Sequence, residues 1–184
     1  KLATDHSTFY VAEAVYNGIA YVSDEPGMFI PDSTEASTNV EVYNSTTDAG
    51  NISITQFHYL LSFSPGAVNV LHIFIVGNSG NETYVGKEGQ TFAFSLPENA
   101  TNISFQNNPA DERFIETDNG YTDTEPVLPG EEGLTVAALY DIPIDGDSLE
   151  IALPVPADVG SVGVMMADQG VDLSSDQVEF SEVR

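Results

Sequence analysis

The stretch ISITQFHYLLSFSPGAVNVLHIFIV, residues 52–76, decides the fold of this 184-residue chain. Its two apolar runs, residues 52–63 and 68–76, are rich in β-branched and aromatic residues, which favour strands over helices. The segment between them, Ser64-Pro65-Gly66-Ala67, contains the Pro-Gly pair that is typical of a tight turn. The pattern therefore predicts a β-hairpin at the centre of a sheet.

Period-two alternation continues along most of the remaining chain, and helical spacing is nearly absent. Further short strands are predicted at residues 40–43, 83–85, 91–95, 102–105, 113–116, 134–142, 148–153, 159–165 and 177–180. Residues 118–132 are rich in acids, Pro and Gly, which indicates a long loop. Many short strands separated by frequent turns are typical of two packed sheets. The predicted fold class is therefore all-β, with an antiparallel β-sandwich.

A second hairpin is predicted near the start of the sequence. Residues 9–16 and 19–23 have the composition of strands, and Asn17-Gly18 suits a type I′ turn, whose two central residues need positive φ. The Pro-bearing acidic segment that follows is typical of a linker. The predicted organisation is an N-terminal β-hairpin at residues 1–24, a linker at residues 25–37 and a main β-sandwich domain at residues 38–184.

The hairpin needs a partner, because an isolated two-stranded hairpin is only marginally stable in water. It either folds back on its own sandwich or adds to the sheet of a neighbouring copy, since strand edges offer free N–H and C=O groups. The second arrangement is a head-to-tail contact, which forms a filament when it does not close. Because the sequence shows no upstream strands to complete the hairpin, we expect the intermolecular arrangement. The expected partner is the chain itself or another cell-surface protein.

The chain is strongly acidic, with 29 Asp and Glu, 4 Lys and Arg and a formal net charge of -25. Such a charge repels phosphate groups, so nucleic acid and anionic lipid are not expected as partners. No apolar run is long enough for a transmembrane helix, so direct membrane insertion is not expected. The acidity fits either adaptation to high salt or the solubility of a secreted protein, and we favour the second. The expected location is extracellular or the cell surface.

Five Asn-x-Ser/Thr sequons are candidate glycosylation sites. They begin at Asn44, Asn51, Asn81, Asn99 and Asn102. All five fall at predicted turns or strand ends, where a glycan is tolerated, although Asn, Ser and Thr are also ordinary turn residues. The first residues of the sequence include neither Met nor an apolar signal segment, so we expect a processed chain or a piece of a longer one.

His58 and His72 are the two histidines with metal-binding potential. If Phe63 lies opposite Ala67, they face each other across the ladder, whereas a shift of one residue puts them on opposite faces. No third ligand is evident and the chain has no Cys, so we expect two packing histidines and no transition metal.

Two acidic turns, Asp145-Gly146-Asp147 and Asp118-Asn119-Gly120, offer oxygen ligands that suit Ca²⁺. Neither has the pattern of an EF-hand loop, so no metal site is assigned. We expect no cofactor, and Ca²⁺ binding is the one alternative that is kept. No nucleophile elbow and no phosphate-binding loop occurs, and no carboxylate pair stands out among the acids. We therefore expect no enzyme and no catalytic residue.

Three further stretches carry a family resemblance. They are QTFAFSLPENATNISFQ (90–106), ERFIETDNGYTDTEPVLPGE (112–131) and YDIPIDGDSLEIALPVPADVGSVGVMMADQGVDLSSDQ (140–177). They resemble prokaryotic exported proteins of the cell envelope in which a carboxypeptidase-regulatory-like β domain precedes a second β-sandwich. These motifs are structural turn patterns, so the resemblance implies a non-catalytic β-sandwich and no site residues.

The expected function is a non-enzymatic structural or adhesion module of the cell surface, such as a subunit of a filament or envelope assembly. The alternative is a β-sandwich that binds carbohydrate or another small ligand. The aromatic residues expected to stack on a sugar are Tyr10, Tyr16 and Tyr21, since the chain has no Trp.

Overall fold

The computed structural model describes residues 11–23, 37–108, 112–155, 159, 162–167, 169–175 and 179. All regular secondary structure in these residues is β, which confirms the predicted fold class. In this described part of the chain, no helix has the length and apolar character needed to cross a membrane.

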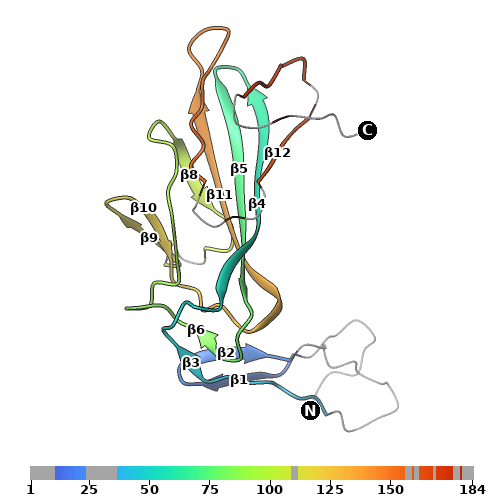
Figure 1. The fold of residues 1–184 in the computed structure, drawn as a ribbon, viewed down its shortest axis with the longest axis vertical. Helices are drawn as coiled ribbons and strands as arrows, with labels where there is room; N and C mark the ends of the chain where they lie inside the picture. The colour runs from blue at the N-terminus through green and yellow to red at the C-terminus, as the bar shows by residue number, and fades with distance from the viewer. Residues whose placement is uncertain are drawn as a thin grey trace.

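A five-stranded sheet in the order β12-β4-β5-β11-β8 forms the main body of the fold (Figure 1). Its strands are β4 (Ile52–Ser64), β5 (Ala67–Asn78), β8 (Thr101–Phe105), β11 (Gly130–Pro143) and β12 (Gly163–Met166). The predicted central hairpin is confirmed, since β4 and β5 pair antiparallel along their length and Pro65-Gly66 turns the chain between them. Gly66 has a φ of 82°, which suits the third position of a type II turn. β12 pairs parallel to β4, which corrects the expectation of a purely antiparallel sheet.

A smaller three-stranded sheet, β7-β10-β9, packs on one face of the large sheet. Its strands are β7 (Phe92–Phe94), β9 (Phe114–Thr117) and β10 (Gly120–Asp123). Phe92 and Phe94 contact Phe74 of β5, with ring centroids 5.0 and 5.4 Å apart. Phe105 of β8 stacks on Phe114 of β9 at 4.4 Å. These aromatic contacts join the two layers of the predicted sandwich.

The core face of β4 changes phase at a β-bulge between Ile54 and Gln56. Ile54 pairs with Val76 before the bulge, and Phe57 pairs with Phe74 after it. The extra residue therefore keeps the apolar side chains of both halves of the strand on the same face. Residues that are almost completely buried in the resulting core include Phe57, Tyr59, Val68, Phe74, Val76, Val127, Val136, Tyr140 and Ile142.

Several predicted strand boundaries were wrong. Residues 118–132, predicted as a loop, contain β10, because Asp118-Asn119 closes a two-residue turn between β9 and β10. Residues 40–43 form no strand, and the pairing lies just beyond them, where β3 (Ser45–Thr46) runs parallel to β6 (Thr83–Tyr84).

The C-terminal third of the chain also differs from its predicted strands. Residues 148–153 form no strand, but Leu149, Ile151 and Leu153 alternate toward the core and pack against it. Its apolar side chains alternate as in a strand because the segment is extended along the core, although it is not part of any sheet in the described structure. The predicted strand at 177–180 lies outside the described residues except for Glu179.

The N-terminal hairpin is confirmed as β1 (Glu13–Tyr16) and β2 (Ile19–Val22). Asn17 and Gly18 have φ values of 52° and 81°, as a type I′ turn requires. The hairpin lies beside β3 and β6, at one end of the large sheet (Figure 1).

Candidate functional site

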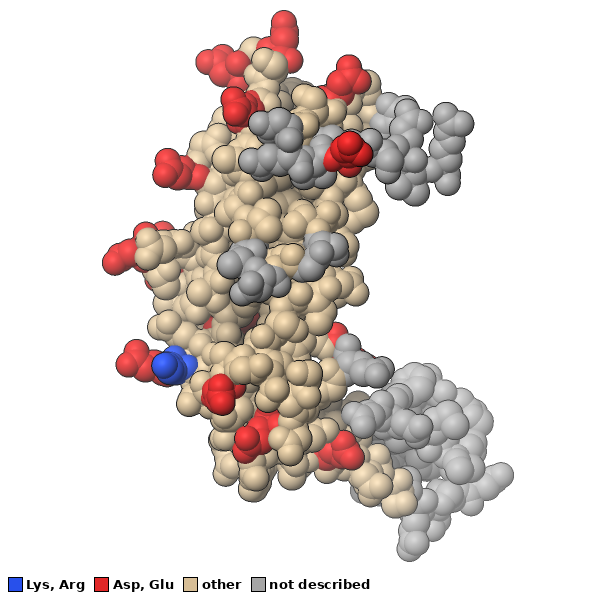
Figure 2. Space-filling model, viewed as in Figure 1, with Lys and Arg blue, Asp and Glu red and all other residues tan. Residues whose placement is uncertain are grey.

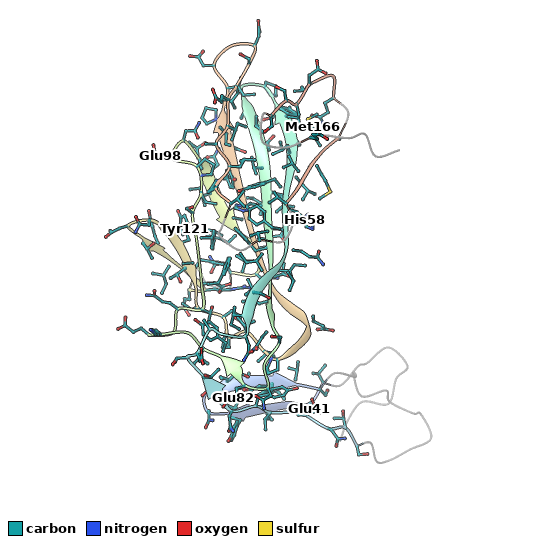
Figure 3. All side chains as sticks on the ribbon, in the orientation of Figure 1. Glu41, His58, Glu82, Glu98, Tyr121 and Met166 are labelled. Carbon is teal, nitrogen blue, oxygen red and sulfur yellow. The ribbon has the colours of Figure 1, made fainter. Side chains whose placement is uncertain are left out.

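The two histidines do not come together. Because the turn after β4 has two residues, Ser64 pairs with Ala67 and the expected pairing of Phe63 with Ala67 is wrong. The register differs by one residue from the expected one, so Tyr59 pairs with His72. The imidazoles of His58 and His72 therefore lie on opposite faces of the sheet. Figure 3 shows His58 on the side away from β10 and its Tyr121. Among the described residues, no group of three His, Cys, Asp or Glu is placed to hold a metal ion.

His72 lies in an aromatic cage within the core and is 0% exposed. Its ring stacks on Tyr59 at 4.2 Å and contacts Phe74 at 4.2 Å and Phe57 at 5.1 Å. Neither ring nitrogen has a hydrogen-bond partner. Burial lowers the pKa of His72 to about 3, so the imidazole is neutral at neutral pH. His72 is therefore a packing residue, as the sequence predicted.

The two tyrosines near His72 are also poor catalytic groups. The Tyr59 hydroxyl donates to the carbonyl of Pro154 at 2.7 Å. Burial raises the pKa of Tyr59, with a smaller contribution from Tyr140, and burial alone raises the pKa of Tyr140. Both phenols therefore stay protonated at neutral pH, and neither supplies an anionic base or nucleophile.

The acidic turns considered for Ca²⁺ are exposed and separate in the fold. Asp118-Asn119 forms the tip between β9 and β10, and Asp145-Gly146-Asp147 forms a bend after β11. Turn geometry is enough to account for acids and Gly at both positions.

The five sequon asparagines are all exposed. Asn102 lies within β8, and its Nδ2, the atom to which a glycan bonds, donates to Oδ2 of Asp141 at 2.7 Å. Attachment at Asn102 therefore competes with this hydrogen bond. Asn44 precedes β3, and its Oδ1 accepts a hydrogen bond from the hydroxyl of Tyr16 at 3.1 Å.

One face of the hairpin is docked on its own chain. Tyr21 is 2% exposed, and its hydroxyl donates to the carbonyl of Tyr43 at 3.0 Å and lies 3.0 Å from Oγ1 of Thr83. Of the two arrangements considered from the sequence, this docked face has the one in which the hairpin folds back on its own chain. It also removes Tyr21 from the candidate sugar-stacking residues, while Tyr10 lies outside the described residues and Tyr16 is partly exposed.

The opposite face of the hairpin is apolar and open to solvent. Val11, Val15 and Val22 alternate onto this face and are 59%, 69% and 56% exposed. We call these three residues the valine face. Among the described strands, β1 and β2 pair only with each other.

A second apolar surface lies on the face of the large sheet that the small sheet does not cover. An open groove of about 720 Å³ there crosses β12, β4, β5 and β11. Its lining includes Leu60, Leu71, Leu139 and Met165, and we call this surface the outer groove. It was not predicted, although the near-continuous apolar run of residues 70–76 signals a strand with apolar side chains on both faces.

A hydrogen-bonded carboxylate lies at the edge of the outer groove. Asp141 accepts from Nδ2 of Asn69 at 2.6 Å and from Nδ2 of Asn102 at 2.7 Å. The bond from Asn102, and then the bond from Asn69, lowers the pKa of Asp141, so this carboxylate is ionised at neutral pH. It is suited to accept hydrogen bonds and not to act as an acid.

Acidic side chains cover both ends and one edge of the molecule in the view of Figure 2, where the middle is largely uncharged. Arg113, one of the few cations, is buried instead and forms two hydrogen bonds with Asp123, from Nε to Oδ1 at 2.8 Å and from Nη2 to Oδ2 at 2.6 Å. Its guanidinium also lies 4.8 Å from the ring centroid of Phe114. This pair holds β10 beside β9, and Arg113 also lines an open pocket of about 680 Å³ together with Asn107, Asn108 and Thr135.

Comparison with known proteins gives no family for the chain. No family model, no curated protein and no solved structure matches it.

Proposed function

We propose that the chain is a non-enzymatic structural module of the cell surface that assembles through its N-terminal hairpin. The observation that carries the proposal is the valine face. Single exposed apolar residues are ordinary on protein surfaces, but three exposed valines gathered on one face of a two-stranded hairpin are suited to contact another chain. A neighbouring chain that covers this face removes apolar area from water.

The remaining features support an extracellular setting. The five sequons are exposed, and the acidic surface keeps the chain soluble until salt or divalent cations screen the repulsion. Nothing in the proposal needs a cofactor, since each contact is made by apolar side chains and backbone groups.

The hairpin is tested by the double substitution Val15→Thr/Val22→Thr. Thr keeps the β-branched shape and the strand preference of Val, so the hairpin is expected to fold. Sedimentation velocity at increasing protein and salt concentration is expected to show assembly of the natural chain and at least about tenfold weaker assembly of the variant. Val42→Thr, which changes an exposed valine outside the hairpin, is the matched control and is expected to assemble normally. A natural chain that stays monomeric at high concentration and high salt contradicts the proposal.

A second candidate function is the binding of a carbohydrate or another small ligand. The observation that favours it is the outer groove, where Asp141, Asn69 and Asn102 offer hydrogen-bonding groups beside an apolar floor. Saturable binding on a glycan array that Asp141→Ala abolishes would support this candidate over assembly.

A further inference from the structure

We propose that the outer groove of one copy receives the valine face of the next copy, an inference that rests on the proposed function. The occupant of the groove is a second copy of this chain. The shape of the two surfaces, their charge and their positions in the molecule support it.

The apolar residues of the outer groove form one straight row. Met165 pairs with Leu60, Leu60 pairs with Leu71, and Leu71 pairs with Leu139, so four side chains lie opposite one another across four strands. Met165 is 47% exposed and Leu139 is 36% exposed. A solvent-facing side of a sheet normally carries polar residues at such positions. The row is therefore an apolar strip without a covering layer in the described structure.

The two surfaces have matching lengths. Four strands are separated by three spacings, so the strip from Met165 to Leu139 is about 14 Å long. Val11 and Val15 are four residues apart along an extended chain, which places them about 13 Å apart. A hairpin lying across the large sheet therefore places Val11 and Val15 near the two ends of the strip, with the paired residues Glu13 and Val22 between them.

The two surfaces carry few charges. Glu13 lies beside the valine face, paired with Val22, and the edge of the outer groove includes Asp141, whose carboxylate is already bound by two amide groups. Most of the acids among the described residues lie elsewhere, including both ends of the view in Figure 2. Apolar, weakly charged surfaces are the places where two copies with a net charge of -25 approach at the lowest electrostatic cost.

The positions of the two surfaces make the contact head-to-tail. In Figure 3 the hairpin lies with Glu41 and Glu82 at one end of the large sheet, and Met166, which lines the groove, lies toward the other end. The valine face of a chain therefore does not reach its own groove. Each copy binds one neighbour through its hairpin and the other neighbour through its groove. Such a heterologous contact extends into a filament unless the rotation closes a ring.

The experiment mixes two variants that are each defective in one surface. The hairpin variant is Val15→Thr/Val22→Thr, and the groove variant is Leu71→Thr/Leu139→Thr. Each alone is expected to remain monomeric, because a chain needs both surfaces to extend. Their equimolar mixture is expected to sediment as a dimer and no larger, since the intact hairpin of the groove variant fits the intact groove of the hairpin variant. Ile115→Thr, an exposed residue of β9 outside both surfaces, is the control and is expected to assemble like the natural chain.

The possible outcomes separate the two proposals. If the groove variant assembles normally and the hairpin variant does not, the hairpin meets another surface and this inference is wrong, while the proposed function stands. If the natural chain does not assemble, both are wrong. A mixture that stays monomeric also overturns the inference. If circular dichroism shows that the groove variant is unfolded, Met165→Thr replaces it, because this side chain is at the edge of the sheet and half exposed.

Discussion

Replacing Arg113 with Met is expected to lower the free energy of unfolding by about 3–5 kcal/mol, because the change leaves the carboxylate of Asp123 buried without its counter-charge. Asp123 is 0% exposed and Arg113 8%. The guanidinium also donates from Nη2 to the carbonyl of Thr135 at 3.1 Å, so the substitution removes this hydrogen bond as well. Urea unfolding at pH 7 measures the loss.

The matched controls identify the cause. The double substitution Arg113→Met/Asp123→Leu removes both charges and is expected to recover most of the stability, since apolar replacement of a buried pair is often nearly neutral. Lys87→Met changes an exposed cation and is expected to shift the free energy of unfolding by less than about 0.5 kcal/mol. A loss below about 1 kcal/mol for Arg113→Met would contradict the assigned role of the pair.

Replacing His72 with Phe is expected to make the fold more stable and less sensitive to acid. At pH 7 the change removes two buried ring nitrogens without hydrogen-bond partners, and we expect a gain of about 1–3 kcal/mol. The volumes are similar and the neighbours are aromatic, so the ring is expected to fit the cage.

The acid effect follows from the lowered pKa of His72, about 3 in the folded chain against about 6.5 when unfolded. Between these values the unfolded chain binds the proton and the folded chain does not, so stability is lost as the pH falls from 6.5 toward 3. The natural chain is expected to lose about 4 kcal/mol more than His72→Phe over this range. Urea unfolding at several pH values measures the difference, with His58→Gln as the control on the other face. Parallel stability curves for the natural chain and His72→Phe would contradict the assignment.

Local signals in the sequence predicted both hairpins correctly. Asn17-Gly18 and Pro65-Gly66 each fix a two-residue turn through the φ values that Gly adopts without strain. The register after β4 was missed because a Pro-Gly pair also fits a longer loop. The alternation of apolar residues in β4 shifts by one position between Ile54 and Phe57, which is the signal of the bulge in the sequence. The bulge changes the pairing of only one half of β4.

The candidate surfaces were harder to predict, because each depends on residues far apart in the chain. Leu60, Leu71, Leu139 and Met165 form a row only when four strands take the observed order and register. Similarly, the docking of Tyr21 on Thr83 joins residues that no local pattern connects. The one available signal for the buried pair was the rarity of cations, since a lone Arg beside apolar residues in an acidic chain is a candidate for burial.

The most direct test of the central claim, head-to-tail assembly of hairpin on groove, is disulfide trapping. The chain has no native Cys, so introduced thiols react only with one another. The double substitutions Val15→Cys/Leu139→Cys and Val15→Cys/Met165→Cys test the two directions in which the hairpin can lie along the strip. After oxidation under assembly conditions, one of them is expected to give a ladder of covalent oligomers on a non-reducing gel, whereas each single substitution gives none. Absence of the ladder, or a covalent dimer from Val15→Cys alone, would contradict the claim, because the first result leaves the two surfaces apart and the second pairs hairpin with hairpin.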